Sequence, residues 1–224
     1  MLTQNDSTYL IKQAQFWDKL NPEEQELLLN NAVPISYPKG SSLHSPDREC
    51  LGVVLVKSGE LRISILSEDG RDITLYRLLP GDFCVLSASC ILNAITFDVH
   101  IEAETDCETI LINAAFFSKL SSQNVYVENF AYKNAVERFS DVMWAMEQIL
   151  FMKLDQRLAI FLLDEMTKNN TQTLTLTQEQ IARYIGSARE VVSRMLKSFQ
   201  SQGILEQSRG TIRILNREKL RELL

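Results

Sequence analysis

Short apolar runs dominate the first half of the chain, from residue 33 to about residue 113. They are rich in β-branched residues and are separated by turn residues, a pattern typical of β-strands. The runs are 53–56, 61–65, 73–76, 99–101 and 109–112. Asp69-Gly70 stands between two runs of alternating polarity and predicts a hairpin. Regularly spaced short strands of this kind indicate a β-roll, barrel or sandwich.

A helical period replaces the strand pattern between residues 122 and 151, where no Gly or Pro occurs. One apolar row has spacings of three and four residues and consists of Tyr132, Ala135, Phe139, Val142, Met146 and Ile149. A second row repeats every seven residues and consists of Val136, Met143 and Leu150. Two apolar rows are more than a helix needs in order to pack on one small domain core. We therefore favour a dimer interface, or seam, along this helix. The alternative is a helix that packs only on its own β-domain.

Two shorter helices are predicted from the residues that would start them. Asn21 is expected to cap a helix with Pro22 at its first position and acids in its first turn. This helix is expected to bury Leu27, Leu28 and Leu29. Asp155 is expected to cap a helix over residues 156–168.

Residues 177–202 contain two motifs that start helices close together. Thr177 with Gln180, and Ser187 with Glu190, both match the capping box, in which two side chains bond each other's backbone N–H. Gly186 fits the end of the first helix. A helix of about eight residues that turns at a glycine into one of about fourteen is typical of a helix-turn-helix.

The second of these helices has a polar face suited to DNA. Its apolar face consists of Val191, Val192, Met195, Leu196 and Phe199, and its polar face of Arg189, Glu190, Ser193 and Arg194. The N-terminal part of a recognition helix reaches base edges, which Arg, Glu and Ser can bond. Glu190 either reads a base or only completes the capping box, and Arg189 fits a phosphate better than a base. Arg183 and Lys197 are either phosphate contacts or solvated.

A small hairpin, or wing, follows that helix. Gln202-Gly203 ends the helix, and Gly210 stands between a short strand and residues 211–215. Arg209 and Arg213 lie on this hairpin.

The net charge of −6 hides a division along the chain. Residues 1–152 carry a net charge of −10, whereas residues 153–224 carry +4. Such asymmetry is typical of an acidic module joined to a nucleic-acid-binding one.

Residues 176–194 resemble the winged helix-turn-helix of the CRP/FNR family of bacterial transcription regulators, and residues 198–205 continue the likeness. Residues 153–159 resemble the family's hinge, while Val56-Lys57-Ser58-Gly59 and Leu79-Pro80-Gly81-Asp82 resemble turns of its cyclic-nucleotide-binding-like β-roll. The resemblance implies an α+β fold in three parts. These are an effector-binding β-roll (a double-stranded β-helix, jelly-roll-like) over residues 1–120, a dimerisation helix over 121–152 and a winged helix-turn-helix over 153–224.

The resemblance also implies a DNA site. Glu190, Ser193 and Arg194 form E-x-x-S-R, as in the FNR branch, which implies TTGA-like half-sites in a TTGA…TCAA palindrome. A homodimer would place the half-sites ~34 Å apart. The residues assigned to DNA are Thr177, Gln178, Ser187, Arg189, Glu190, Ser193, Arg194, Lys197 and Arg209. RNA polymerase is an expected further partner.

The roll departs from the family's cyclic-nucleotide cassette. That cassette has a Gly-Glu pair and an Arg after the Gly-Asp turn, but here no Gly-Glu follows Gly81-Asp82, and no Lys or Arg occurs between Arg77 and Lys119. A phosphate needs a fixed cation or a nest of backbone donors. We therefore expect an unidentified effector other than a cyclic nucleotide. Its expected pocket consists of Cys84, Val85, Leu86, Ser87 and Cys90. Residues 91–97 either line a pocket for an uncharged effector or pack on the long helix.

The four cysteines leave three interpretations open. Cys50, Cys84, Cys90 and Cys107 lack the close N-terminal spacing of the FNR cluster, and His44 and His100 are the only histidines. The cysteines are small buried hydrophobes, or Cys84 and Cys90 form a thiol sensor, or a metal or cluster is bound. No metal site is assigned from the sequence, and the cofactor is unknown.

Other classes are disfavoured by the composition. No apolar run approaches the ~20 residues that span a bilayer, and the polar N-terminus is unlike a secretory signal, so we expect a cytoplasmic protein. No P-loop, nucleophile elbow or paired-acid motif suggests an enzyme. A ligand-binding module that regulates a partner protein is the other alternative, but such modules lack a winged helix-turn-helix.

Overall fold

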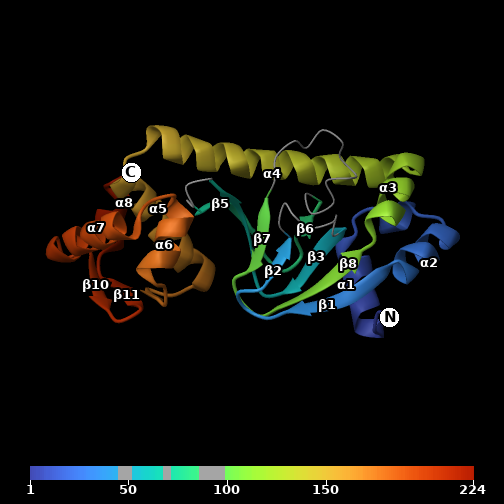
Figure 1. Ribbon diagram of the computed structural model, residues 1–224, viewed down its shortest axis with the longest axis horizontal. Coiled ribbons are helices and arrows are strands. Elements are labelled where there is room, and N and C mark those ends of the chain that lie inside the picture. Colours follow the sequence, from blue (N-terminus) through green and yellow to red (C-terminus); the bar gives the residue numbers. More distant parts are fainter. Residues whose placement is uncertain (45–51, 68–71, 86–98) are drawn as a thin grey trace. The chain divides into compact units, whose positions relative to one another are not determined.

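The computed structural model describes residues 1–44, 52–67, 72–85 and 99–224 (Figure 1). The chain forms two compact units, residues 1–65 with 75–142 and residues 66–74 with 143–224, and each is described by itself. The predicted turn at Asp69-Gly70 lies outside the described residues, as do Cys50, Cys90 and residues 91–97.

Two four-stranded sheets, β1-β8-β3-β6 and β2-β7-β4-β5, form the predicted β-roll. The strands are β1 Ala32–Tyr37, β2 Ser42–His44, β3 Val53–Ser58, β4 Leu61–Leu66, β5 Asp72–Leu78, β6 Phe83–Cys84, β7 His100–Ala103 and β8 Cys107–Ile112. The first four residues of strand β3 are all apolar, because both faces of the strand are buried there, and only Lys57 and Ser58 at its end are polar. Val54 and Val56 join a cluster with Leu61 and Ile63 of β4, whereas Leu55 packs among residues of the helices.

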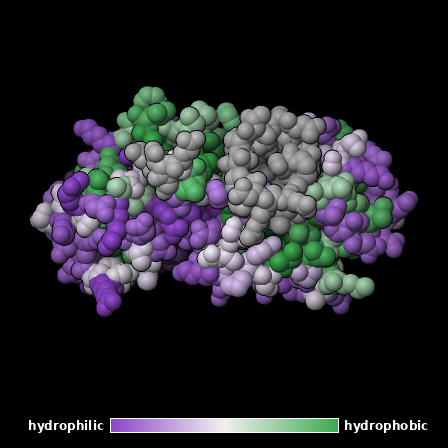
Figure 2. All heavy atoms as spheres, in the orientation of Figure 1, coloured by the Kyte–Doolittle hydropathy of each residue, from purple (hydrophilic) through white to green (hydrophobic). Residues whose placement is uncertain are grey.

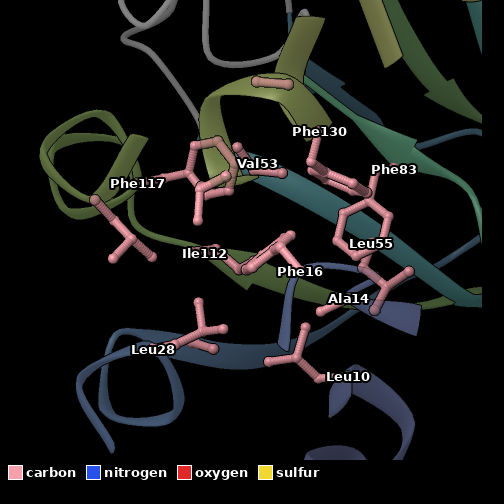
Figure 3. Packing of buried hydrophobic residues seen from close by; sticks show 14 of the residues in the cluster. Leu10, Ala14, Phe16, Leu28, Val53, Leu55, Phe83, Ile112, Phe117 and Phe130 are labelled. Carbon is pink, nitrogen blue, oxygen red and sulfur yellow. The ribbon is translucent and has the colours of Figure 1, made fainter. Parts of the chain in front are cut away.

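The helices of the first unit build a second cluster on the other side of β3. They are α1 Gln4–Gln13, the short 3₁₀ helix η1 Trp17–Lys19, α2 Pro22–Asn30, α3 Ala114–Gln123 and the long α4 Val125–Phe151 as far as Val142. Residues 143–151 of α4 belong to the second unit. Figure 3 shows Phe16, Phe83 and Phe130 packed together in this cluster. The Phe130 ring meets the rings of Phe16 and Phe83 edge to face, each at 4.9 Å between centroids.

Three details of these helices differ from the sequence prediction. Only Leu28 of the predicted leucine triplet is fully buried, and Leu27 is 43% exposed, because a nine-residue helix turns one narrow face inward. The long helix starts at Val125, after a break at Asn124, rather than at residue 122. Helix α1 was not predicted at all. The cap at Asn21 is confirmed, since Asn21 Oδ1 accepts a hydrogen bond from Glu24 N at 2.9 Å.

The second unit carries the helix-turn-helix. Its elements are α5 Leu154–Asn169, β9 Thr173–Leu174, α6 Gln178–Ile185, α7 Arg189–Ser201, β10 Leu205–Ser208, β11 Thr211–Ile214 and α8 Arg217–Arg221. Strands β10 and β11 form the predicted wing hairpin, and β9 adds a third strand that the sequence did not reveal. Helix α5 begins at Leu154 with Lys153 at its cap, so the expectation that Asp155 caps it was wrong. Lys153 N donates to Gln156 Oε1 at 3.1 Å.

One negative finding concerns membranes. Across the described ranges, no helix is long and apolar enough to cross a bilayer.

Candidate nucleic-acid interface

Helix α6 starts as the sequence predicts. Thr177 Oγ1 accepts a hydrogen bond from Gln180 N at 3.1 Å, and Gln180 Oε1 accepts one from Thr177 N at 2.9 Å. The helix ends at Gly186, whose φ of 61° lies in the left-handed region that favours glycine. These two ends set the sharp turn into α7.

The second predicted capping box does not form, which corrects the sequence interpretation of Ser187. Helix α7 has Ala188 at its cap, with no side-chain cap hydrogen bond. The backbone N–H of Ser187 instead donates to Ala182 O at 2.9 Å and so completes the end of α6. Helix α7 thus begins one residue later than a cap at Ser187 would require. Glu190 therefore has no capping role, and its side chain is exposed.

Helix α7 separates an apolar face from a charged one. Val192, Leu196 and Phe199 are buried, whereas Val191 and Met195, predicted to be buried, are only partly so. Arg189, Glu190, Arg194 and Lys197 are exposed, and Ser193 is half-buried. Over the described ranges no carboxylate forms an ion pair with Arg189, Arg194 or Lys197. These cations are therefore available to an external anion.

A groove of about 550 Å³ joins the helix-turn-helix to the wing. Its lining includes Thr177 and Gln178 at the start of α6, Arg189 at the start of α7, and Arg209 on the wing. The groove therefore brings together four of the nine residues assigned to DNA. The other five, Ser187, Glu190, Ser193, Arg194 and Lys197, do not line it. Backbone N–H groups at a helix start bind phosphates, so this groove can hold a phosphodiester backbone.

The wing is fixed to both helices by three glutamines, of which the sequence analysis singled out Gln178 but not Gln200 or Gln207. Gln178 Nε2 donates to Gln207 Oε1 at 3.4 Å, and Gln207 Nε2 donates to Gln200 Oε1 at 3.3 Å. Gln207 also lines the groove. No short motif marks this residue, because its partners lie on two other elements.

Helices α5 and α4 also contact the turn between α6 and α7. Arg157 Nη1 of α5 donates to Ile185 O at 2.9 Å, and burial lowers the pKa of Arg157. A Cβ added to Gly186 would lie 3.4 Å from Ile149 Cδ1 of α4. The last turns of α4 therefore pack directly on the helix-turn-helix.

Helix α4 leaves a continuous apolar row exposed, although not quite the one predicted. Ala135 and Val142 are half-buried, and Val142 packs against the cluster inside the roll. The exposed row runs with spacings of four and three residues through Tyr132, Val136, Phe139, Met143, Met146 and Leu150. Ile149 is exposed as well. Figure 2 shows hydrophobic residues at the surface toward the C-terminal end of α4, at the upper left, and a mainly hydrophilic surface over α7 and the wing.

The expected effector pocket is only partly described. Cys84 and Val85 are fully buried, while Leu86, Ser87 and Cys90 lie outside the described residues. Burial raises the pKa of the neighbouring Tyr76 phenol, and the charge of the Cys84 thiolate would raise it further. Among the described residues, Cys84 and Cys107 form no disulfide. In the described ranges no three His, Cys, Asp or Glu side chains are grouped to hold a metal ion.

Three cations on the described strands of the roll already have carboxylate partners. Lys57 pairs with Asp6 at 2.9 Å, Arg62 with Glu102 at 2.9 Å and Arg77 with Glu60 at 3.1 Å. Each of these three cations is thus engaged within the protein rather than held ready for a phosphate.

Comparison with known proteins identifies relatives for both units. A model of the cyclic nucleotide-binding domain matches residues 34–124, and a model of the Crp-like helix-turn-helix domain matches residues 156–223. A crystal structure of a crp/fnr-family protein from Eubacterium rectale is 43% identical, with a TM-score of 0.91, over 95% of this chain and 98% of that one.

Two curated relatives are more distant. The cAMP-activated global transcriptional regulator Vfr of Pseudomonas aeruginosa is 26% identical over 75% of this chain and 81% of its own length. The probable transcriptional regulator flp of Lacticaseibacillus casei is 28% identical over 82% of this chain and 84% of its own length.

Proposed function

The chain belongs to the CRP/FNR family of DNA-binding transcription regulators, and we propose that it binds a TTGA…TCAA palindrome as a homodimer. The observation that carries this proposal is the exposed start of α7, where Glu190 and Arg194 face outward without an ion pair to the described residues. Arg bonds guanine bidentately, and Glu accepts from cytosine, which are the bases of a TTGA half-site read on its two strands.

Base reading and phosphate binding fall on different residues. Glu190, Ser193 and Arg194 occupy adjacent turns of α7 and read the bases. Thr177, Gln178, Arg189 and Arg209 line the groove and hold the DNA backbone, as Ser187 and Lys197 do beside it. Phosphate contacts fix the register of the protein on the duplex, and base contacts supply the sequence preference.

The homodimer forms along α4. A row of six exposed apolar side chains is costly in water and is buried when two copies of α4 pack together. This pairing sets the two α7 helices on one face of the duplex, with half-site centres about ten base pairs apart. We propose the boundaries 1–120, 121–152 and 153–224 for the effector, dimerisation and DNA-binding parts.

The effector acts through a shift between two conformations. It binds in or beside the roll, changes how the two α4 helices pack and thereby reorients the DNA-binding parts about the hinge near Leu154. A ligand shifts such an equilibrium only by its different affinity for the two states. A cyclic nucleotide is a poor candidate, because Lys57, Arg62 and Arg77 are each paired with a carboxylate. We further expect RNA polymerase as a partner.

Fluorescence anisotropy with labelled duplexes tests the proposal. We expect the full chain to prefer the TTGA…TCAA duplex over the same duplex with scrambled half-sites by at least about 100-fold. Arg194→Ala is expected to weaken binding to the palindrome about tenfold or more while leaving scrambled-duplex binding nearly unchanged, because it removes a base contact. Arg217→Ala removes the same charge from the exposed surface outside the groove and is the matched control. Equal effects of both variants would refute the assignment of α7.

A further inference from the structure

A small polar cavity lies within the first unit, apart from Cys84 and Val85. It is bounded by the loop after α1, the turn before β6 and the middle of α4, and its volume is about 130 Å³. An engineered cavity of ~150 Å³ is known to hold one benzene molecule, so this cavity fits a ligand of about six heavy atoms. It is well below the ~300–1,000 Å³ of sites for drug-sized ligands and is too small for a nucleotide.

The charges that line the cavity balance. Lys133 and Arg138 come from α4, and they face Asp82 from the turn before β6 and Glu137 from α4. Two cations against two carboxylates give the lining no net charge. A purely anionic or purely cationic ligand would therefore be repelled by half of the set, whereas a ligand that carries both charges can satisfy both halves.

Arg138 has hydrogen-bond donors that no described residue engages. Its side chain is only 13% exposed, and Nη1 binds Asp141 Oδ2 at 3.0 Å. Its Nη2 is 4.0 Å from Asp82 and 3.9 Å from Glu137, beyond hydrogen-bonding distance. Its buried Nε has no hydrogen-bond partner in the described parts of the chain. Buried donors are rarely left unpaired, so this guanidinium is suited to an additional acceptor.

The remaining lining is partly aromatic and partly amide. Phe83 and Phe130 lie next to each other (Figure 3) and both line the cavity. Their rings meet edge to face, with 87° between the ring planes. Gln13 and Asn134 add side-chain amides, which donate and accept hydrogen bonds. The lining thus offers an apolar wall beside two sets of opposite charge.

We propose that this cavity binds a small α-amino acid as a zwitterion. The carboxylate meets Arg138 and Lys133, the ammonium group meets Asp82 and Glu137, and a short side chain lies against Phe83 and Phe130. The volume limits that side chain to a few carbon atoms. No purely acidic or purely basic metabolite of the same size matches the lining as well.

Binding here would act on α4, and that consequence rests on the proposed function. Lys133 and Glu137 stand next in sequence to Tyr132 and Val136 of the exposed apolar row. An amino acid that ties Lys133 and Arg138 to the turn before β6 would fix this part of α4 against the roll. It would thereby favour one packing of the two α4 helices over the other.

Isothermal titration calorimetry on the full chain tests the site without DNA. L-Alanine and glycine are the probes, and propionate and ethylamine each match alanine but lack one of its two charged groups. We expect alanine to bind at least about tenfold more tightly than either analogue, because each loses one set of charge-assisted hydrogen bonds. Equal affinity for alanine and propionate, or no binding of any small amino acid, would overturn the proposal.

Variants inside and outside the cavity lining test where the amino acid binds. Glu137→Gln and Lys133→Gln change exposed side chains of the lining and should each weaken alanine binding about fivefold. Glu128→Gln changes an exposed acid of α4 outside the lining and should leave binding unchanged. Circular dichroism confirms that each variant is folded. If Glu128→Gln weakens binding as much as Glu137→Gln, the site lies elsewhere.

The same samples separate this proposal from the proposed function. Duplex binding with no amino acid binding would refute the cavity site and leave the regulator intact. Amino acid binding without duplex binding would support the cavity site and refute the proposed function. With both present, alanine should change the affinity for the palindrome, and Glu137→Gln should reduce that change. An affinity for the palindrome that is the same with and without saturating alanine would refute the coupling to α4.

Discussion

Asp6 shows how a single charged residue fastens a helix to a sheet. Its carboxylate accepts hydrogen bonds from the Thr3 hydroxyl at 2.6 Å and from Lys57 Nζ of β3 at 2.9 Å. The Thr3 hydroxyl and then the Lys57 ammonium lower the pKa of Asp6 from 3.8 to about 2, although burial opposes the shift. Tyr9 adds a further bond from its hydroxyl to Val56 O at 3.2 Å. Helix α1 is therefore held on the roll by polar contacts as well as by Leu10.

Asp6→Asn is predicted to destabilise the protein in a pH-dependent way. Because the pKa is lower in the folded state, the charge contributes stability above pH 3.8, and that contribution is lost as the pH falls through about 2. We expect the free energy of unfolding to fall by about 1–3 kcal/mol at pH 7. The difference from the native chain should narrow between pH 4 and pH 2. Urea denaturation across this range measures it, with exposed Asp18→Asn as the control.

Helix α4 has two apolar faces, one buried in its own domain and one exposed. Val127, Phe130 and Ala131 are buried in the first unit, and Arg138 packs its guanidinium over the Tyr76 ring at 5.3 Å. The row from Tyr132 to Leu150 remains exposed on another side of the helix. A helix with one face against its own domain and a second apolar face free is suited to self-association.

Phe139→Glu is predicted to dissociate the homodimer. Phe139 is 64% exposed in the single chain, so the change should leave each subunit folded, but pairing would bury two facing carboxylates. We expect light scattering after size exclusion to report a monomer and far-ultraviolet circular dichroism to stay unchanged. Ser140→Glu puts the same charge on an exposed position outside the row and should keep the dimer. A dimer that survives Phe139→Glu would exclude this face as the seam.

For the whole molecule, the uneven distribution of charge along the chain determines which part can be attracted to DNA. The chain carries −6 overall, so DNA attraction must come from residues 153–224, which carry +4. On this unit, the exposed cations of α7 and the wing lie near the groove. Attraction confined to one part of an acidic molecule is screened by salt, and it orients the molecule during encounter.

The affinity for the palindrome is therefore predicted to fall steeply with salt. The logarithm of the association constant should decline linearly with the logarithm of salt concentration, with a slope of about −0.9 per phosphate contact. Lys197→Gln should reduce that slope by about one and weaken binding to palindrome and scrambled duplexes alike, because it removes a phosphate contact. Anisotropy titrations at 50 to 200 mM salt measure both effects. A slope unchanged by Lys197→Gln would mean that Lys197 is merely solvated.

The sequence by itself determined the elements whose causes are local. The caps at Asn21 and Thr177, the turn at Gly186 and the wing around Gly210 depend on residues a few positions apart, and all are present in the structure. The apolar runs likewise predicted five strands of the roll, β3, β4, β5, β7 and β8, whereas β1, β2 and β6 were not predicted.

The tertiary structure decided what depends on segments far apart in the chain. It did not decide the start of α7, where the sequence motif failed for a local reason: the Ser187 backbone closes α6 by bonding Ala182 O, and Ala188 is the cap of α7. The tertiary structure determined which apolar row of α4 is exposed, because it covers Ala135 and Val142 in part and leaves Val136 exposed. It also brought Arg138 to Asp82 across the fold. Local hydrogen bonds reach only three or four residues, whereas burial and charge pairing depend on which distant side chains the fold makes neighbours.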